Sequence, residues 1–182
     1  MISNMTNSLL SNFANPVQAA RVTVLHEDLP TALCAKALFD CVVPQLDGAE
    51  LELDYWRCDA LREPALREDS ARTSQASAII VFSIRNRKTL PPEIKDWLNE
   101  WMAGRADHPC AFVALIAGGR SDDDENHPVL RQLRRVAEKS GADFFCEHCE
   151  APPAAACQSR AEPAWSTVFA APKRTDCWRV NA

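Results

Sequence analysis

Apolar and polar positions along this chain fall into blocks that predict strands and helices in turn. The clearest block spans residues 78–103. It opens with an unbroken apolar run at 78–82, which predicts a buried strand, and continues through a basic loop at 85–89. A helix is predicted from Pro92, because its apolar residues recur at the spacing of one helical face. These residues are Ile94, Trp97, Leu98 and Trp101.

The same alternation of strand and helix patterns extends on both sides of this block. Strands are predicted at 21–26, 51–56, 78–82, 110–117 and 142–146. Helices are predicted at 31–46, within 63–75, from Pro92 onward, and at 128–140. The connections are too long for hairpins, so the pattern predicts a parallel sheet with right-handed crossovers.

The polarity of each predicted strand indicates its place in the sheet. Segment 51–56, LELDYW, carries charged residues on one face only, which is typical of an edge strand. Segments 78–82 and 110–117 are apolar on both faces, as central strands covered by helices must be. We therefore expect a five-stranded parallel sheet with the order 2-1-3-4-5 inside a three-layer αβα sandwich.

One domain is predicted, at residues 21–147, between two segments of different character. Residues 1–20 are polar and are expected to form a mobile arm. Residues 148–182 have no clean helical stripe and are expected to form an irregular tail that packs on the domain. Such a sheet usually has a fifth helix beside the first one. We expect Trp165, Phe169 and Trp178 to cover that face instead, or a partner subunit to do so.

Composition narrows the classes of partner. A net charge of -5 argues against nucleic acid, because phosphate contacts need a basic surface. The apolar runs are shorter than a membrane span, and the N-terminal segment is a poor signal peptide. A cytoplasmic location is expected, with reduced thiols. Four of the eight cysteines are expected to act as small buried hydrophobes, namely Cys34, Cys41, Cys58 and Cys110.

Two segments resemble a known family. Residues 91–99, with Asn86 before them, are similar to the NADPH-dependent FMN reductase signature Pro-x-Tyr-Asn…Pro-x-x-Leu-Lys-x-x-(Ile/Leu)-Asp. Residues 108–120 resemble the strand and loop Lys-Pro-Val-Ala-Leu-Val…Gly-Gly-Arg of that family. The resemblance to that family covers roughly 22–145 in layout. The chain also resembles uncharacterised bacterial flavodoxin-like proteins that share the patterns strand–Glu-Asp–helix and Leu-Pro-x-x-(Ile/Val)-Lys-x-Trp. The resemblance implies a flavodoxin-like fold, with FMN as the cofactor.

The resemblance implies a set of FMN-binding residues at the carboxyl ends of the strands. They are Thr31, Arg85, Asn86, Gly118, Gly119 and Arg120. Several neighbours depart from the family pattern. Glu27 and Asp28 stand where the family wraps the phosphate, and two carboxylates are expected to repel a dianion. Arg85 replaces a tyrosine and Ser83 a proline, and acidic residues replace the second glycine pair.

Two other kinds of site can be considered from the residues. Cys146 and Cys149 form a Cys-x-x-Cys motif that could bind zinc or form a disulfide, with Cys157 or His127 to complete a zinc tetrad. Glu27 and Asp28 resemble the acidic pair of response-regulator receiver domains, and with 122–124 they could hold a divalent cation. A receiver also needs an aspartate at the end of the third strand.

The third strand ends at Ser83 rather than at an aspartate, so a working phosphoreceiver is not expected. The leading functional hypothesis is a non-catalytic or degenerate binding or interaction module. It would meet another copy of itself, or a protein partner, through the tail. Two alternatives remain open: an FMN-dependent NAD(P)H oxidoreductase, and a metal- or thiol-dependent module at residues 146–149.

Overall fold

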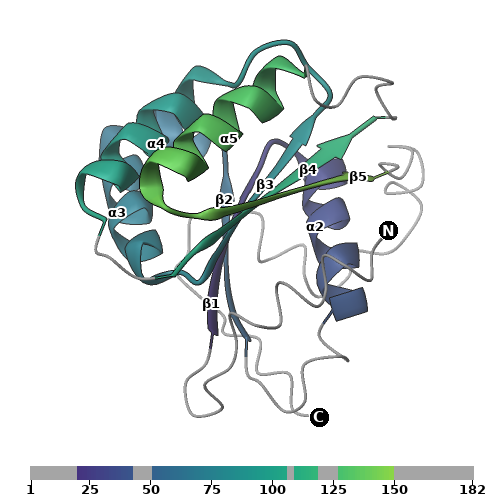
Figure 1. Ribbon diagram of the computed structural model, residues 1–182, viewed down its shortest axis with the longest axis horizontal. Coiled ribbons are helices and arrows are strands. Elements are labelled where there is room, and N and C mark those ends of the chain that lie inside the picture. Colours follow the sequence, from purple (N-terminus) through teal and green to yellow (C-terminus); the bar gives the residue numbers. More distant parts are fainter. Residues whose placement is uncertain (1–19, 43–50, 106–108, 119–126, 150–182) are drawn as a thin grey trace.

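A five-stranded parallel sheet forms the centre of the protein (Figure 1). The computed structural model describes residues 20–42, 51–105, 109–118 and 127–149. The strands are β1 Ala20–His26, β2 Leu51–Arg57, β3 Ile79–Arg85, β4 Ala111–Ala117 and β5 Asp143–Cys149. Their order is β2-β1-β3-β4-β5, and every neighbouring pair is parallel. The predicted fold class and strand order are confirmed.

Helices cover both faces of the sheet. The described helices are α2 Leu29–Val42, α3 Pro64–Thr73, α4 Pro92–Ala103 and α5 Pro128–Ser140, with short 3-10 turns at Ala60–Arg62 and Ser74–Ala76. Figure 1 shows α2 on one face and the other three helices on the opposite face. The strand order with helices on both sides is the flavodoxin-like arrangement.

The larger part of the core lies between the sheet and helices α3, α4 and α5. Trp97 and Trp101 of α4 are fully buried there and stack with their ring centroids 6.2 Å apart. The Trp97 Nε1–H donates to Ser70 Oγ at 2.9 Å, and the Trp101 Nε1–H donates to the Ser74 carbonyl at 3.3 Å. Both indole N–H groups are thus satisfied inside the core, as burial requires.

A smaller core lies under α2. It contains alternate residues of the strands together with Ala35 and Phe39 of the helix. Leu51, Leu53 and Tyr55 of β2 face this cluster, and β2 lies at the edge of the sheet, as its alternating pattern predicted. Each strand therefore contributes its two faces to two separate cores.

Two element boundaries differ from the sequence-based expectation. β3 continues through Arg85, which was expected to lie in a loop. β5 continues through Cys149, three residues beyond the predicted end at Cys146. The residues after Val42 that were expected to complete the first helix lie outside the described part, as do the N-terminal arm before Ala20 and the tail beyond Cys149. Among the described residues, no helix is long and apolar enough to cross a membrane.

Candidate functional site

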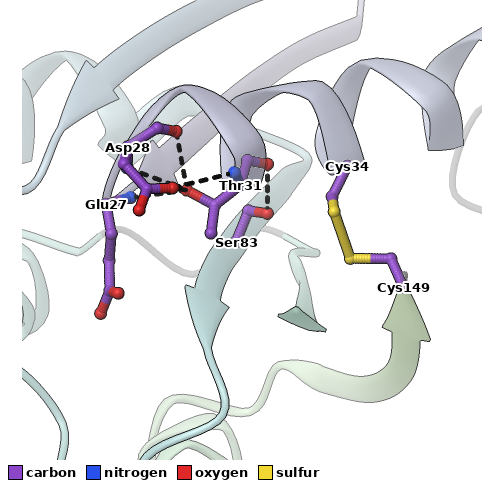
Figure 2. Close-up of a disulfide and its surroundings, with 6 residues drawn as sticks. All are labelled: Glu27, Asp28, Thr31, Cys34, Ser83 and Cys149. Atoms are coloured by element: carbon purple, nitrogen blue, oxygen red, sulfur yellow. Dashed lines mark hydrogen bonds between the residues drawn. A yellow bond between two sulfur atoms is a disulfide. The ribbon is translucent and has the colours of Figure 1, made fainter. Parts of the chain in front are cut away.

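The turn between β1 and α2 lies at the carboxyl edge of the sheet, where ligands bind in this kind of fold. It has only two residues, Glu27 and Asp28, between the end of β1 and the start of α2. The buried Thr31 hydroxyl accepts hydrogen bonds from the amides of Glu27 and Asp28, both at 3.0 Å (Figure 2). It donates in return to the Asp28 carbonyl at 2.8 Å.

A further amide at the N-terminus of α2 is also hydrogen-bonded within this turn. The Thr31 amide donates to Asp28 Oδ1 at 3.1 Å, and Pro30 has no N–H to offer. The Ser83 hydroxyl donates to the Thr31 carbonyl at 2.6 Å and fastens the turn to β3 (Figure 2). A phosphate at a helix N-terminus needs free amides that point at it. Here the donors at Glu27, Asp28 and Thr31 are already bonded within the turn.

The two acidic residues of the turn are paired with Arg85, the last residue of β3, and with Arg87 in the loop after it. Arg85 Nε donates to Asp28 Oδ2 at 2.6 Å, and Arg87 Nη2 donates to Glu27 Oε2 at 3.0 Å. These ion pairs offset part of the negative charge that was expected to repel a dianion at this turn. The arginines lie nearly sixty positions later in the chain, and the β1–β3 pairing brings them to the turn. Bonded amides and ion pairs thus occupy the turn at which the resemblance places a phosphate.

The pKa values of the two carboxyls move in opposite directions. Burial acts to raise the pKa of Asp28, but hydrogen bonds from the Thr31 amide and from Arg85 outweigh it and hold the pKa below its usual value. Burial raises the pKa of Glu27 above its usual value, against the opposing effect of Arg85 and Arg87. Asp28 is therefore the more firmly ionised member of the pair.

His26, the last residue of β1, lies beneath this turn and is 2 % exposed. Its Nδ1 is 3.2 Å from the Asp28 carbonyl oxygen, so that nitrogen carries the proton. Burial lowers the pKa of His26 from 6.5 to about 4, and Arg57 acts in the same direction. The hydrogen bond to Asp28 and the charges of Asp28 and Asp59 oppose this shift without cancelling it. The folded protein holds this imidazole neutral at physiological pH.

Asn86 and Gly118 come together at the loops that follow β3 and β4. The Asn86 amide donates to the Ala117 carbonyl at 2.8 Å, and its side-chain Oδ1 lies 3.0 Å from His127 Nε2. Gly118 has a φ of 106°, which favours glycine. A Cβ at Gly118 would lie 4.0 Å from the Asn86 Cβ. Thr31, Arg85, Asn86 and Gly118 thus share one edge, and Gly119 and Arg120 lie outside the described residues.

The two cysteines of the Cys-x-x-Cys motif lie on opposite faces of β5. Cys146 packs toward the larger core, and Cys149 forms a disulfide with Cys34 of α2 (Figure 2). A strand turns alternate side chains to opposite faces, so residues three apart cannot form a pair. Within the described ranges, no group of three or more His, Cys, Asp or Glu residues could hold a metal. Cys149 is thus bonded to Cys34 rather than paired with Cys146, and Cys157, a further candidate ligand, lies outside the described residues.

The sequence predicted Cys34, Cys41, Cys58 and Cys110 as free buried thiols, and the side chain of Cys41 lies outside the described part. Cys58 and Cys110 are free and buried, and burial raises the pKa of both, that of Cys110 to about 11. Cys34 is buried too, but the prediction was wrong for its thiol, which is bonded to Cys149. No short-range sequence signal connects Cys34 with Cys149, because they are separated by 115 positions.

The strand order and the helices on both faces define a flavodoxin-like α/β protein. In the turn after its first strand, the amides of Glu27, Asp28 and Thr31 are bonded within the turn. No protein-family model matches the sequence, and no curated protein matches it. A search of solved structures finds a similar chain described as Trp repressor binding protein from Bacillus subtilis. The two chains are 12% identical, with a TM-score of 0.43, over 78% of this chain and 99% of that one.

Proposed function

We propose that this chain is a flavodoxin-like binding or interaction module that works without FMN catalysis. The observation that carries the proposal is the two-residue turn at Glu27 and Asp28, whose amides are bonded to the Thr31 hydroxyl. A nucleotide phosphate would have to displace that hydroxyl and the arginines that pair with both acids. A preformed anion site would instead leave the amides free.

When the protein is titrated into a solution of FMN, we expect the FMN fluorescence to fall only by dilution. The purified protein is also expected to be colourless and to produce no NADPH oxidation above that of free FMN. Riboflavin serves as the matched ligand control because it lacks the phosphate. Saturable quenching of FMN with one equivalent of protein would overturn the proposal.

One observation favours the FMN-dependent NAD(P)H oxidoreductase as the second candidate. Asn86 and Gly118 lie beside each other at the edge where the resemblance places the flavin ring. If the wild-type protein quenches FMN fluorescence and the flavin lies beside Asn86, then Asn86→Ala should weaken the quenching. Lys88→Ala, in the same loop, serves as the control. Quenching that both variants retain would place the flavin elsewhere.

Partners are proposed to meet the chain through residues 148–182, and a second copy of the chain is the simplest one. Sedimentation velocity over a dilution series is expected to show a species heavier than the 20.2 kDa chain that dissociates on dilution. Trp165→Ala or Trp178→Ala should weaken it, whereas Trp56→Phe, in β2, should not. Both tail tryptophans lie outside the described residues. A single species of chain mass at every concentration would contradict self-association.

A further inference from the structure

A disulfide bond between Cys34 and Cys149 joins helix α2 to strand β5, two elements that pack mainly on different parts of the protein. Cys34 lies in the second turn of α2, and Cys149 is the last residue of β5 (Figure 2). Their Cα atoms are 6.1 Å apart, within the normal range for a disulfide. α2 packs mainly on β1, β3 and β4, whereas β5 pairs with β4 and packs on α5. The disulfide is therefore a direct tie between the helix and the end of the edge strand.

The end of β5 is paired with β4 through Cys149, on one side only. β5 is an edge strand that pairs on one side only, and all of its residues after Asp143 are partly exposed. At its end, the Gly118 amide donates to the Cys149 carbonyl at 3.3 Å. Elements with little burial and exposed hydrogen bonds open at low free-energy cost. We therefore expect a reagent in solution to reach this end of the strand without global unfolding.

The two sulfur atoms differ in access. Cys34 is 5% exposed, and Cys149 is partly exposed. The free thiols of the described residues are not placed to exchange with this bond, because Cys146 faces the opposite side of the sheet and Cys58 and Cys110 are buried. Among the described cysteines, exchange is thus confined to this one pair.

We propose that Cys34–Cys149 is a reversible thiol–disulfide site that reacts with dithiol reductants, and that its reduction releases the end of β5 from α2. The proposal does not depend on the proposed function. In the reducing cytoplasm that the sequence predicts, disulfides are usually transient or redox-sensing rather than permanent.

The exchange involves two electrons and one dithiol molecule. A thiolate of the dithiol attacks Cys149 Sγ, the bond to Cys34 Sγ breaks, and Cys34 leaves as a thiolate that takes up a proton. The second thiol of the reagent then attacks the mixed disulfide. It releases Cys149 as a thiol, and the reagent becomes a cyclic disulfide. The protein pair is reduced by two electrons, and the dithiol is oxidised by two.

The test treats the folded, oxidised full-length protein with dithiothreitol and labels the thiols with a maleimide. Peptide mass spectrometry is expected to show label gained at Cys34 and Cys149, with the circular dichroism spectrum retained. Hydrogen exchange should show loss of amide protection at 147–149, while β1, β3 and β4 stay protected. Oxidised glutathione should restore the same pair and the protection.

Two outcomes would overturn the proposal. One is a Cys34–Cys149 bond that resists dithiothreitol until denaturant is added, which would make it a permanent structural crosslink. The other is an oxidised protein in which both cysteines label without reductant, so that no bond forms.

Variants of the full chain separate the pair from the other thiols. Cys149→Ser should abolish the dithiothreitol-dependent change in exchange at the strand end. Cys146→Ser, its matched control three residues earlier, should leave the change intact. If Cys149→Ser does not fold, the labelling and exchange of the wild-type protein decide the question without it.

Discussion

Replacing Trp97 with alanine is expected to lower the free energy of unfolding by about 3–5 kcal/mol, the usual cost of removing a buried tryptophan. Its side chain is fully buried between α4 and the sheet. It stacks on Trp101, meets Phe82 edge-on with ring centroids 6.2 Å apart, and donates a hydrogen bond to Ser70. The alanine variant leaves a large cavity and removes the indole donor of Ser70 Oγ, which keeps its own hydrogen bond to the Arg67 carbonyl. Urea unfolding followed by circular dichroism measures the change.

Two further variants separate the contributions at this position. Trp97→Phe keeps an aromatic ring and should lower the free energy of unfolding less than Trp97→Ala does. It loses the hydrogen bond to Ser70 but only part of the side-chain volume. Ser70→Ala removes the acceptor but leaves the indole in place, and it should cost about 1–3 kcal/mol for an unsatisfied buried N–H. Equal stability of Trp97→Ala and wild type would contradict the packing described for α4.

The strand order could be predicted because the pattern of apolar and polar residues in each strand indicates how deeply that strand is buried in the sheet. β3 and β4 are apolar on both faces and lie inside the sheet, and β2 is half polar and lies at its edge. The end of β5 could not be predicted in this way. Glu147 and His148 interrupt the apolar run, yet an edge strand accepts polar residues at partly exposed positions.

The chemistry of the carboxyl edge was harder to predict, because it depends on contacts between distant segments. Glu27 and Asp28 form an acidic pair in the sequence, but in the fold they face Arg85 and Arg87. The Cys34–Cys149 bond likewise requires α2 and the end of β5 to meet across the sheet. Neighbouring residues alone do not specify either contact. The role of Thr31 is more local, since a hydroxyl three residues after Asp28 can cap its own turn.

These local and distant contacts lead to one physical account of the edge. Thr31 uses the amides that a phosphate would need, and the arginines neutralise the acids that would otherwise attract a cation. Most polar groups of the turn are thus bonded within the protein, whereas Glu27 Oε1 is buried without a hydrogen-bond partner. The bonded amides support the proposed module, which would present a fixed surface rather than hold a charged nucleotide.

Acidification from pH 7 to pH 4 is expected to lower the free energy of unfolding by about 3 kcal/mol through His26. In the folded protein, burial lowers its pKa from 6.5 to about 4, whereas in the unfolded chain the imidazole titrates normally. The unfolded chain therefore takes up the proton first as the pH falls. The stabilisation is complete above pH 6.5 and is lost as the pH falls through about 4. Each pH unit between the two pKa values corresponds to about 1.4 kcal/mol.

Urea unfolding at pH 7, 5.5 and 4 measures this loss in wild type and in His26→Gln, which cannot be protonated. The difference between the two proteins should shrink toward acid. That comparison also sets aside Glu27, whose raised pKa contributes stability in the opposite direction, present at low pH and lost as the pH rises. A His26→Gln variant that loses stability in parallel with wild type would show that this imidazole is not the group that titrates.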